Sequence, residues 1–398
     1  MSTPSPLLGG LTADEFLADY WQKRPLLIRN AIPGFSSPIS PDELAGLACE
    51  EEVESRLILE RDGPGPWSVE HGPLPEERFA ELPETHWTLL IQDCQRYVPE
   101  LVQLMGRFDF IPSWRVDDVM ASYAPAHGSV GPHLDQYDVF LLQAHGRRRW
   151  QISDNAVEPD NLLPGLALRI MREFEPTDEW VLEPGDMLYL PPNLAHYGVA
   201  VDHCITLSVG FRAPSHEELL AGFVDHLLAS RSLSQRYADP DLSPQAHPGE
   251  ISAGALQRCR DMVRELILDA LHDDSSDGFD GWFGQFITDA KNEQTALPPE
   301  QTLNPERFVQ LFRDRQTLYR SEYARFAYTA HDGGARLFID GRCHVLSPPL
   351  APAAPLLCDR HHYPFALFEA VLTDGPDRVA FACLLTELYN EGYLVTGS

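Results

Sequence analysis

Lysine is nearly absent from this chain of 398 residues, which contains only Lys23 and Lys291. Lysine and arginine together number 30, against 60 aspartates and glutamates, so the formal net charge is −30. Binding to nucleic acid needs basic side chains that displace counterions from phosphate, and docking on an anionic membrane has a similar need. The composition therefore argues against both kinds of partner and leaves few candidates for Schiff-base chemistry. The acidity suits a well-solvated surface or, alternatively, a basic protein substrate.

The chain also has little that would indicate export, disulfides or a membrane span. Its seven cysteines are an odd number with no CxxC pair, which favours neither a disulfide framework nor a zinc cluster. The N-terminus shows no basic segment followed by an apolar one, and no apolar run reaches the ~18 residues of a membrane helix. We therefore expect a cytoplasmic protein without a membrane partner.

Short β-branched and aromatic runs, interrupted by glycine and proline, fill residues 115–214. This stretch has no long amphipathic pattern, so it predicts a barrel or a double-sheet jelly roll. Before it, the capping box Thr12–Glu15 predicts a helix that continues to Pro25. Residues 56–60 and 67–70 flank Asp62-Gly63, which is a hairpin signal.

Helical spacing replaces this pattern after residue 214. A capping box at Ser215–Glu218 begins one predicted helix, and a proline-rich linker at 239–248 separates it from a second over 256–270. The last hundred residues read as a small mixed α/β unit, with a hairpin over 336–345 that turns at Asp340-Gly341. The whole chain is therefore expected to be α+β.

The segment Gly131–Phe140 contains the first candidate metal ligands. In a strand, residues i and i+2 share a face, so His133 and Asp135 would point the same way, with Tyr137 beyond them. One imidazole and one carboxylate are two-thirds of the 2-His-1-carboxylate triad that binds non-haem Fe(II). An HxD pair alone is weak evidence, because chance examples are common.

His196 is the candidate third ligand, and its surroundings are more specific. It follows the turn and buried strand of Glu183–Pro192, and this order resembles the second cupin motif. Asn193 stands where that motif usually has glycine, and asparagine can adopt the same positive φ. The alternative is that these are ordinary histidines and aspartates of a barrel.

Arg148 indicates which co-substrate such a metal would use. We predict a hairpin of 139–144 and 148–153 around His145-Gly146, with Arg148 pointing into the barrel. A buried arginine is costly unless it meets an anion, and the distal carboxylate of 2-oxoglutarate would supply one. Ser122 could add a hydroxyl to that carboxylate. The alternatives are a surface arginine in a basic patch and a serine satisfied within its strand.

Several long strings resemble one family in the same order: HLDQYDVFLLQ from His133, GRRRW from Gly146, EPGDMLYLPP from Glu183 and SVGFRAP from Ser208. They are similar to the bacterial JmjC-domain ribosomal oxygenases, the YcfD-type protein arginine hydroxylases. The resemblance implies a JmjC jelly roll with N-terminal helices at 1–214, a helical dimerisation region at 215–298 and a C-terminal winged-helix-like domain at 299–398.

The resemblance also implies a reaction and its residues. Fe(II), 2-oxoglutarate and O₂ would hydroxylate Cβ of an arginine in large-subunit ribosomal protein sixteen. Arg148 would anchor 2-oxoglutarate, and Asp118 and Tyr137 would grip the substrate arginine, as a carboxylate and a phenol can. The implied iron ligands are His133, Asp135 and His196.

Other interpretations remain open at this point. The same site could serve a JmjC-type protein demethylase, or the fold could be a non-catalytic cupin-like binding module. Asp118 could be a solvated loop acid and Tyr137 a packed core tyrosine. The apolar faces after residue 215 and the resemblance predict a homodimer, and the acidic balance predicts no direct contact with nucleic acid.

Overall fold

The strand-rich stretch predicted from the sequence lies in the first of two structural units of the computed structural model, residues 1–213 and 214–398. The first unit ends close to the predicted limit of the catalytic domain, whereas the further division at residue 298 stays a prediction. The structure describes residues 4–60, 67–158, 160–166, 168–275, 278–290, 295–373 and 377–397.

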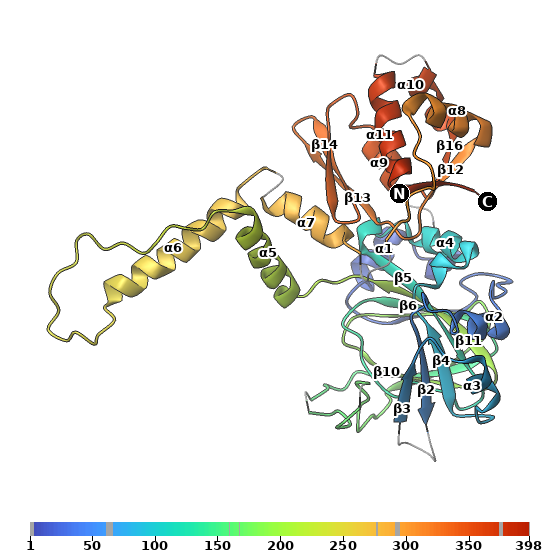
Figure 1. Ribbon diagram of the computed structural model, residues 1–398. Helices are drawn as coiled ribbons and strands as arrows, with labels where there is room; N and C mark the ends of the chain where they lie inside the picture. Colours follow the sequence, from blue (N-terminus) through green and yellow to red (C-terminus); the bar gives the residue numbers. More distant parts are fainter. Residues whose placement is uncertain are drawn as a thin grey trace. The chain divides into compact units, whose positions relative to one another are not determined.

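Two antiparallel sheets form the jelly roll of the first unit (Figure 1). The larger has eight strands in the order β1-β9-β6-β11-β5-β4-β2-β3, and the smaller has three in the order β10-β7-β8. The strands are β1 (Leu26–Ile28), β2 (Ser55–Glu60), β3 (Trp67–His71), β4 (Trp87–Ile91), β5 (Val116–Ala124), β6 (Val139–His145), β7 (Arg148–Ser153), β8 (Asp178–Leu182), β9 (Met187–Leu190), β10 (Ala195–Ala200) and β11 (Cys204–Phe211).

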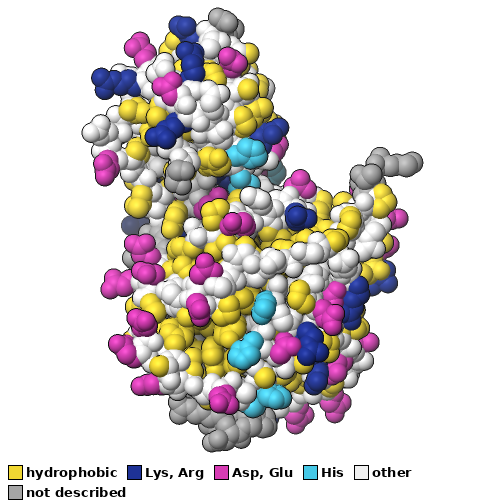
Figure 2. All heavy atoms as spheres, turned by 90° about the vertical axis from the view of Figure 1, so that its right-hand side faces the viewer, with side chains coloured by type: hydrophobic (Ala, Val, Ile, Leu, Met, Phe, Trp, Pro, Cys, Tyr) yellow, Lys and Arg dark blue, Asp and Glu magenta, His cyan; other side chains and the backbone are white. Residues whose placement is uncertain are grey.

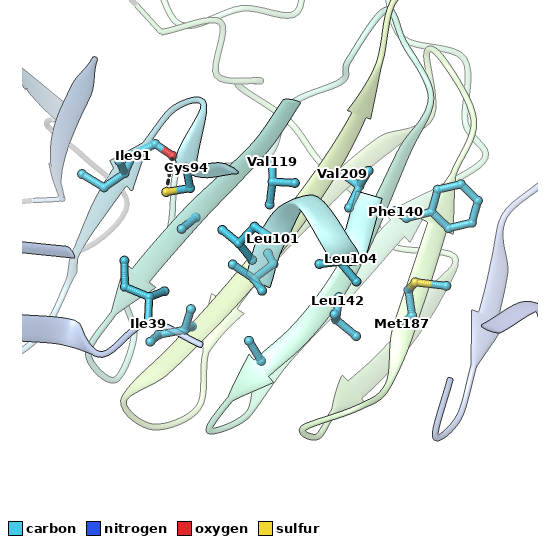
Figure 3. Packing of buried hydrophobic residues seen from close by; sticks show 14 of the residues in the cluster. Ile39, Ile91, Cys94, Leu101, Leu104, Val119, Phe140, Leu142, Met187 and Val209 are labelled. Carbon is cyan, nitrogen blue, oxygen red and sulfur yellow. Dashed lines mark hydrogen bonds between the residues drawn. The ribbon is translucent and has the colours of Figure 1, made fainter. Parts of the chain in front are cut away.

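Successive side chains of a strand point to opposite faces of a sheet, and at the central strand β6 both faces are buried. Val139 and Leu141 of β6 pack with Trp150 of β7 in a core between the two sheets. Phe140 and Leu142 of the same strand belong to a larger core on the other face, which helices cover. In Figure 3, Leu101 and Leu104 of α4 lie over that face.

The helices of this unit precede the central strands. The capping box at Thr12 is present as predicted, but α1 ends at Asp19 and not at Pro25, since Gln22 takes a left-handed φ of 58°. The helical elements are η1 (Pro6–Leu8), α1 (Ala13–Asp19), α2 (Pro41–Leu47), α3 (Glu76–Ala80), η2 (Cys94–Arg96), α4 (Pro99–Met105), η3 (Gly106–Phe108) and η4 (Ser113–Arg115).

The two hairpins predicted for this unit have different outcomes. Strands β2 and β3 pair antiparallel as predicted, with Glu60 opposite Trp67; the predicted turn at Asp62-Gly63 lies outside the described residues. The hairpin over 139–153 is wrong, because β6 pairs with β11 and β9 while β7 pairs with β10 and β8. The chain passes from one sheet to the other through Gly146, where a Cβ would lie 2.0 Å from the backbone oxygen of His203.

The second unit contains helices and two small sheets, ordered β16-β12-β17 and β13-β14-β15. The predicted turn at Asp340-Gly341 is confirmed: both residues have positive φ, 50° and 74°, as a two-residue type I′ turn requires. Its helical elements are α5 (His216–Ser230), α6 (Ala253–Leu271), α7 (Phe279–Thr288), α8 (Pro305–Arg315), α9 (Ala353–Cys358), η5 (Phe365–Leu367), α10 (Glu369–Thr373) and α11 (Arg378–Asn390). Its strands are β12 (Thr317–Arg320), β13 (Phe326–His331), β14 (Gly334–Ile339), β15 (Arg342–Leu346), β16 (His362–Pro364) and β17 (Leu394–Thr396).

Within the described ranges, none of the helices combines the length and apolar character that crossing a membrane would require.

Candidate functional site

The structure brings His133, Asp135 and His196 together. One potential ligand atom from each lies within 4.8 Å of the others, and His196 Nε2 is 3.6 Å from Asp135 Oδ2. The secondary structure around these residues differs from the prediction in one respect. His196 lies on β10, but the segment with His133 and Asp135 has no continuous strand, because β6 begins only at Val139.

An isolated β-bridge between His133 and His196, and not a continuous strand, brings the ligand residues together. The backbone N–H of His133 donates to the His196 oxygen at 3.0 Å, and the N–H of His196 donates to the His133 oxygen at 2.8 Å. The N–H of Asn193 donates to the Asp135 oxygen at 2.6 Å. Asn193 has the predicted positive φ, 64°. These three backbone hydrogen bonds hold the segment with His133 and Asp135 against β10 and the corner before it.

Hydrogen bonds to backbone oxygens orient both imidazoles. Nδ1 of His133 lies 2.9 Å from the Gly131 oxygen, and Nδ1 of His196 lies 2.9 Å from the Leu194 oxygen. A carbonyl only accepts, so each Nδ1 carries the hydrogen and each Nε2 keeps a lone pair. Such an outer hydrogen bond is usual for histidines that bind metal.

The charge state of this group also suits a cation. Burial, together with the neighbouring His133, lowers the pKa of His196, which keeps that imidazole neutral. Two imidazoles and a carboxylate form the donor set of a non-haem Fe(II) site with open coordination positions. The residues therefore fit the metal that the sequence predicted.

Arg148 is buried on β7, only 2% exposed, which rules out a surface arginine. Its Nε and Nη2 atoms find no hydrogen-bond partner in the described part of the chain. Its guanidinium carbon lies 5.7 Å from the ring centre of Trp150, and that ring lies 5.9 Å from the ring of His196. A buried cation with unused donors near the triad fits an anionic ligand, and a carboxylate matches its geometry.

Ser122 is buried on β5 opposite Thr206 of β11. Its hydroxyl donates to the Thr206 backbone oxygen over 3.4 Å. This contact matches the simpler of the two interpretations, a serine satisfied within its sheet, and a role toward 2-oxoglutarate stays a prediction.

Asp118 and Tyr137 meet at Gly210. Asp118 is buried on β5 and is not a solvated loop acid, and Tyr137 is 43% exposed and not a packed core residue. A Cβ on Gly210 would lie 3.4 Å from Asp118 Oδ1 and 4.0 Å from Tyr137 Cε2. The missing side chain leaves room between a carboxylate and a phenol. Partial burial and neighbouring carboxylates, Asp135 first among them, raise the pKa of Tyr137, so the phenol stays neutral.

Sequence reasoning missed a buried network behind Tyr137. Asp138 is fully buried and accepts from the Tyr189 hydroxyl at 2.6 Å and from the Gln22 amide at 2.9 Å. Arg115 lies 3.4 Å from the same carboxylate. The available signal was a second aspartate, Asp138, that follows Asp135 closely in the sequence.

Comparisons with known proteins identify the class. Residues 103–219 match the family model of the JmjC domain, and residues 269–395 match that of the ROXA-like winged helix. The JmjC fold and its site define a 2-oxoglutarate-dependent hydroxylase.

Closer relatives identify the family. The chain is 37% identical over 379 residues to the ribosomal protein uL16 3-hydroxylase of Escherichia coli (strain K12), covering 95% of this chain and 96% of that protein. It is 34% identical over 347 residues to a probable ribosomal oxygenase of Haemophilus influenzae, covering 83% and 81%.

Solved structures agree with these relatives. The X-ray structure of E. coli YcfD has a TM-score of 0.85 at 36% identity, covering 99% of both chains. The structure of YcfD with cobalt and 2-oxoglutarate has a TM-score of 0.81 at 36% identity, covering 96% of this chain and 98% of that one. The chain belongs to the family of JmjC-domain ribosomal oxygenases. The predicted family, and the predicted jelly roll followed by a winged-helix-like domain, are confirmed.

Proposed function

We propose that this enzyme hydroxylates Cβ of an arginine in ribosomal protein uL16, using Fe(II), 2-oxoglutarate and O₂. The proposal rests on one observation: groups suited to bind a metal and 2-oxoglutarate lie close to groups suited to bind a guanidinium. A metal-binding triad lies close to a buried arginine with unused donors, and a carboxylate and a phenol border the gap at Gly210. The name of the E. coli relative, a uL16 3-hydroxylase, supports this substrate.

Each residue has a positioning task in this reaction. Bound at the triad, Fe(II) supplies the chemistry that couples decarboxylation of 2-oxoglutarate to C–H hydroxylation by O₂. Arg148 pairs with the distal carboxylate of 2-oxoglutarate and fixes the co-substrate's direction. Asp118 and Tyr137 hold the guanidinium of the substrate, so the length of the arginine side chain sets which carbon faces the metal.

The net charge suits a cationic substrate without identifying it. Opposite charge accelerates the encounter with a basic ribosomal protein. In Figure 2, however, aspartate and glutamate side chains are spread over the visible face. General surface adaptation would produce the same pattern. We propose a cytoplasmic location, where such a substrate is made, and no direct contact with nucleic acid.

Mass spectrometry of a uL16 peptide tests the proposed function. Incubation with Fe(II), 2-oxoglutarate and O₂ is expected to add one oxygen to an arginine, and fragmentation should place it on Cβ. Omitting Fe(II) or replacing the arginine with lysine should leave the peptide unmodified. Removal of a methyl group from a methylated peptide would instead support a demethylase, and absence of any 2-oxoglutarate turnover would support a binding module.

We also propose that residues 215–298 form the dimer interface, which light scattering tests. Leu220 and Leu228 of α5 are each 63% exposed, and Val263 of α6 is also exposed. Such apolar faces are typical of protein contacts.

We expect the wild type to have twice the 44.7 kDa chain mass, and the double variant Leu220→Glu/Leu228→Glu to be monomeric. Val379→Glu, at an exposed apolar position of α11, is the matched control and should remain dimeric. A monomeric wild type would refute the proposal.

A further inference from the structure

Two groups from the segment that directly follows β4 hold the carboxylate of Asp118. Its Oδ2 accepts hydrogen bonds from the Gln92 amide nitrogen and from the backbone N–H of Asp93, the latter at 3.2 Å. Its Oδ1 is the oxygen beside Gly210 and Tyr137. Oδ2 is therefore bonded to the protein framework, and Oδ1 borders the gap where the substrate side chain is proposed to bind.

Gln92 has a fixed backbone position. It directly follows β4, whose last residue, Ile91, pairs with Ser55 of β2 and Ala121 of β5. Its own N–H donates to the Glu54 oxygen at 2.9 Å. The side chain of Gln92 thus starts from the sheet itself and reaches Asp118 on the neighbouring strand.

Arg56 determines which way the Gln92 amide points. Its Nη2 donates to Gln92 Oε1 at 3.2 Å. A guanidinium only donates, and Asp118 Oδ2 already accepts from the Asp93 N–H, so the amide oxygen must face Arg56 and the amide nitrogen must face Asp118. The reversed amide would set two donors against each other on one side and two acceptors on the other. The order Arg56, Gln92, Asp118 therefore permits a single arrangement.

We infer that Gln92 and Arg56 are positioning residues for the substrate's cationic side chain, acting through Asp118. With the Asp93 N–H, they hold the plane of the Asp118 carboxylate so that Oδ1 lies beside Gly210, next to Tyr137. Without them Oδ2 keeps the Asp93 N–H but loses the Gln92 amide, so the plane of the carboxylate is held less firmly and the target carbon is placed less accurately against the metal. This inference rests on the proposed function, because it assumes that the cation bound at Asp118 belongs to the substrate.

Kinetics of Gln92→Met test the inference, since methionine keeps the length of the side chain and removes both hydrogen bonds. We expect the KM for the uL16 peptide to rise about tenfold, which corresponds to losing one hydrogen bond to a charged group. The KM for 2-oxoglutarate should not change. The fraction of 2-oxoglutarate turnovers that yield hydroxylated arginine should fall, a result that mere loss of stability would not produce.

Kinetics of Arg56 variants provide a second test of the inference. Arg56→Met should show the same kind of defect, and Arg56→Lys, which keeps a donor, should restore much of the coupling. Because the residues act in series, the double variant Arg56→Met/Gln92→Met should be no worse than Gln92→Met alone. Additive effects in the double variant would contradict action through a single chain.

The matched control is Gln151→Met. Gln151 also donates to a carboxylate, Glu179, at 2.7 Å, but on the outer side of β7. It should behave like the wild type.

The affinity of the cobalt-loaded proteins for the peptide can be measured without turnover, and Gln92→Met should bind the peptide about tenfold more weakly. If the wild type fails to hydroxylate arginine, the proposed function fails. If the wild type is active and Gln92→Met has its KM, affinity and coupling, the positioning inference is overturned.

Discussion

His133→Ala is expected to abolish hydroxylation and to remove tight metal binding. The variant leaves one imidazole and one carboxylate, which cannot hold the metal in a defined geometry. Loss of an outer hydrogen-bond partner of a metal ligand already costs roughly 10–100-fold in affinity or activity, so loss of a ligand should cost more. Titration with a divalent metal and measurement of 2-oxoglutarate turnover check the two parts separately.

The control for this variant is His127→Ala. His127 is exposed and stacks on His86 with ring centres 5.1 Å apart. It should keep wild-type metal affinity and turnover. Equal turnover of 2-oxoglutarate by the wild type and His133→Ala would mean that the triad is not catalytic, and the non-catalytic binding module would then be the better account.

The position of the triad could be predicted from the sequence, but the geometry that builds it could not. The HxD spacing and the cupin-like corner identified His133, Asp135 and His196, and Asn193 has the positive φ expected of it. The assumed reason, one strand with two side chains on the same face, was wrong. The ligands meet through a bridge between His133 and His196, and pairing across such a distance has no local signal.

The missed features have a common physical cause. The predicted hairpin around Gly146 fails because six of the seven residues of β6 are buried, so its pattern cannot show which sheet the next strand joins. Strands β16 and β17 have only three residues each and exist through pairing with β12. Gln92, which follows β4, and Gly210, on β11, both lie beside Asp118 although they are far apart in the sequence. In each case tertiary pairing, and not local preference, decides the outcome.

Arg148→Met is expected to weaken 2-oxoglutarate binding by about 100-fold or more, because two charge-assisted hydrogen bonds are lost together. The same change should raise the melting temperature of the ligand-free protein. A buried guanidinium whose Nε and Nη2 lack partners among the described residues is costly, and a methionine of similar length removes that cost. Calorimetric titration and thermal melting, each with and without 2-oxoglutarate, measure the two opposite effects.

Arg149→Met is the matched control, because the neighbouring residue points the other way. Arg149 is exposed and lies 3.5 Å from Glu179, and such a surface ion pair contributes about 0–1 kcal/mol. It should bind 2-oxoglutarate like the wild type and gain no stability. Since a ligand stabilises only the folded state that binds it, 2-oxoglutarate should raise the melting temperature of the wild type and of Arg149→Met but not of Arg148→Met. Wild-type affinity in Arg148→Met would show that the buried guanidinium serves another anion, and the assignment of 2-oxoglutarate to this pocket would then be wrong.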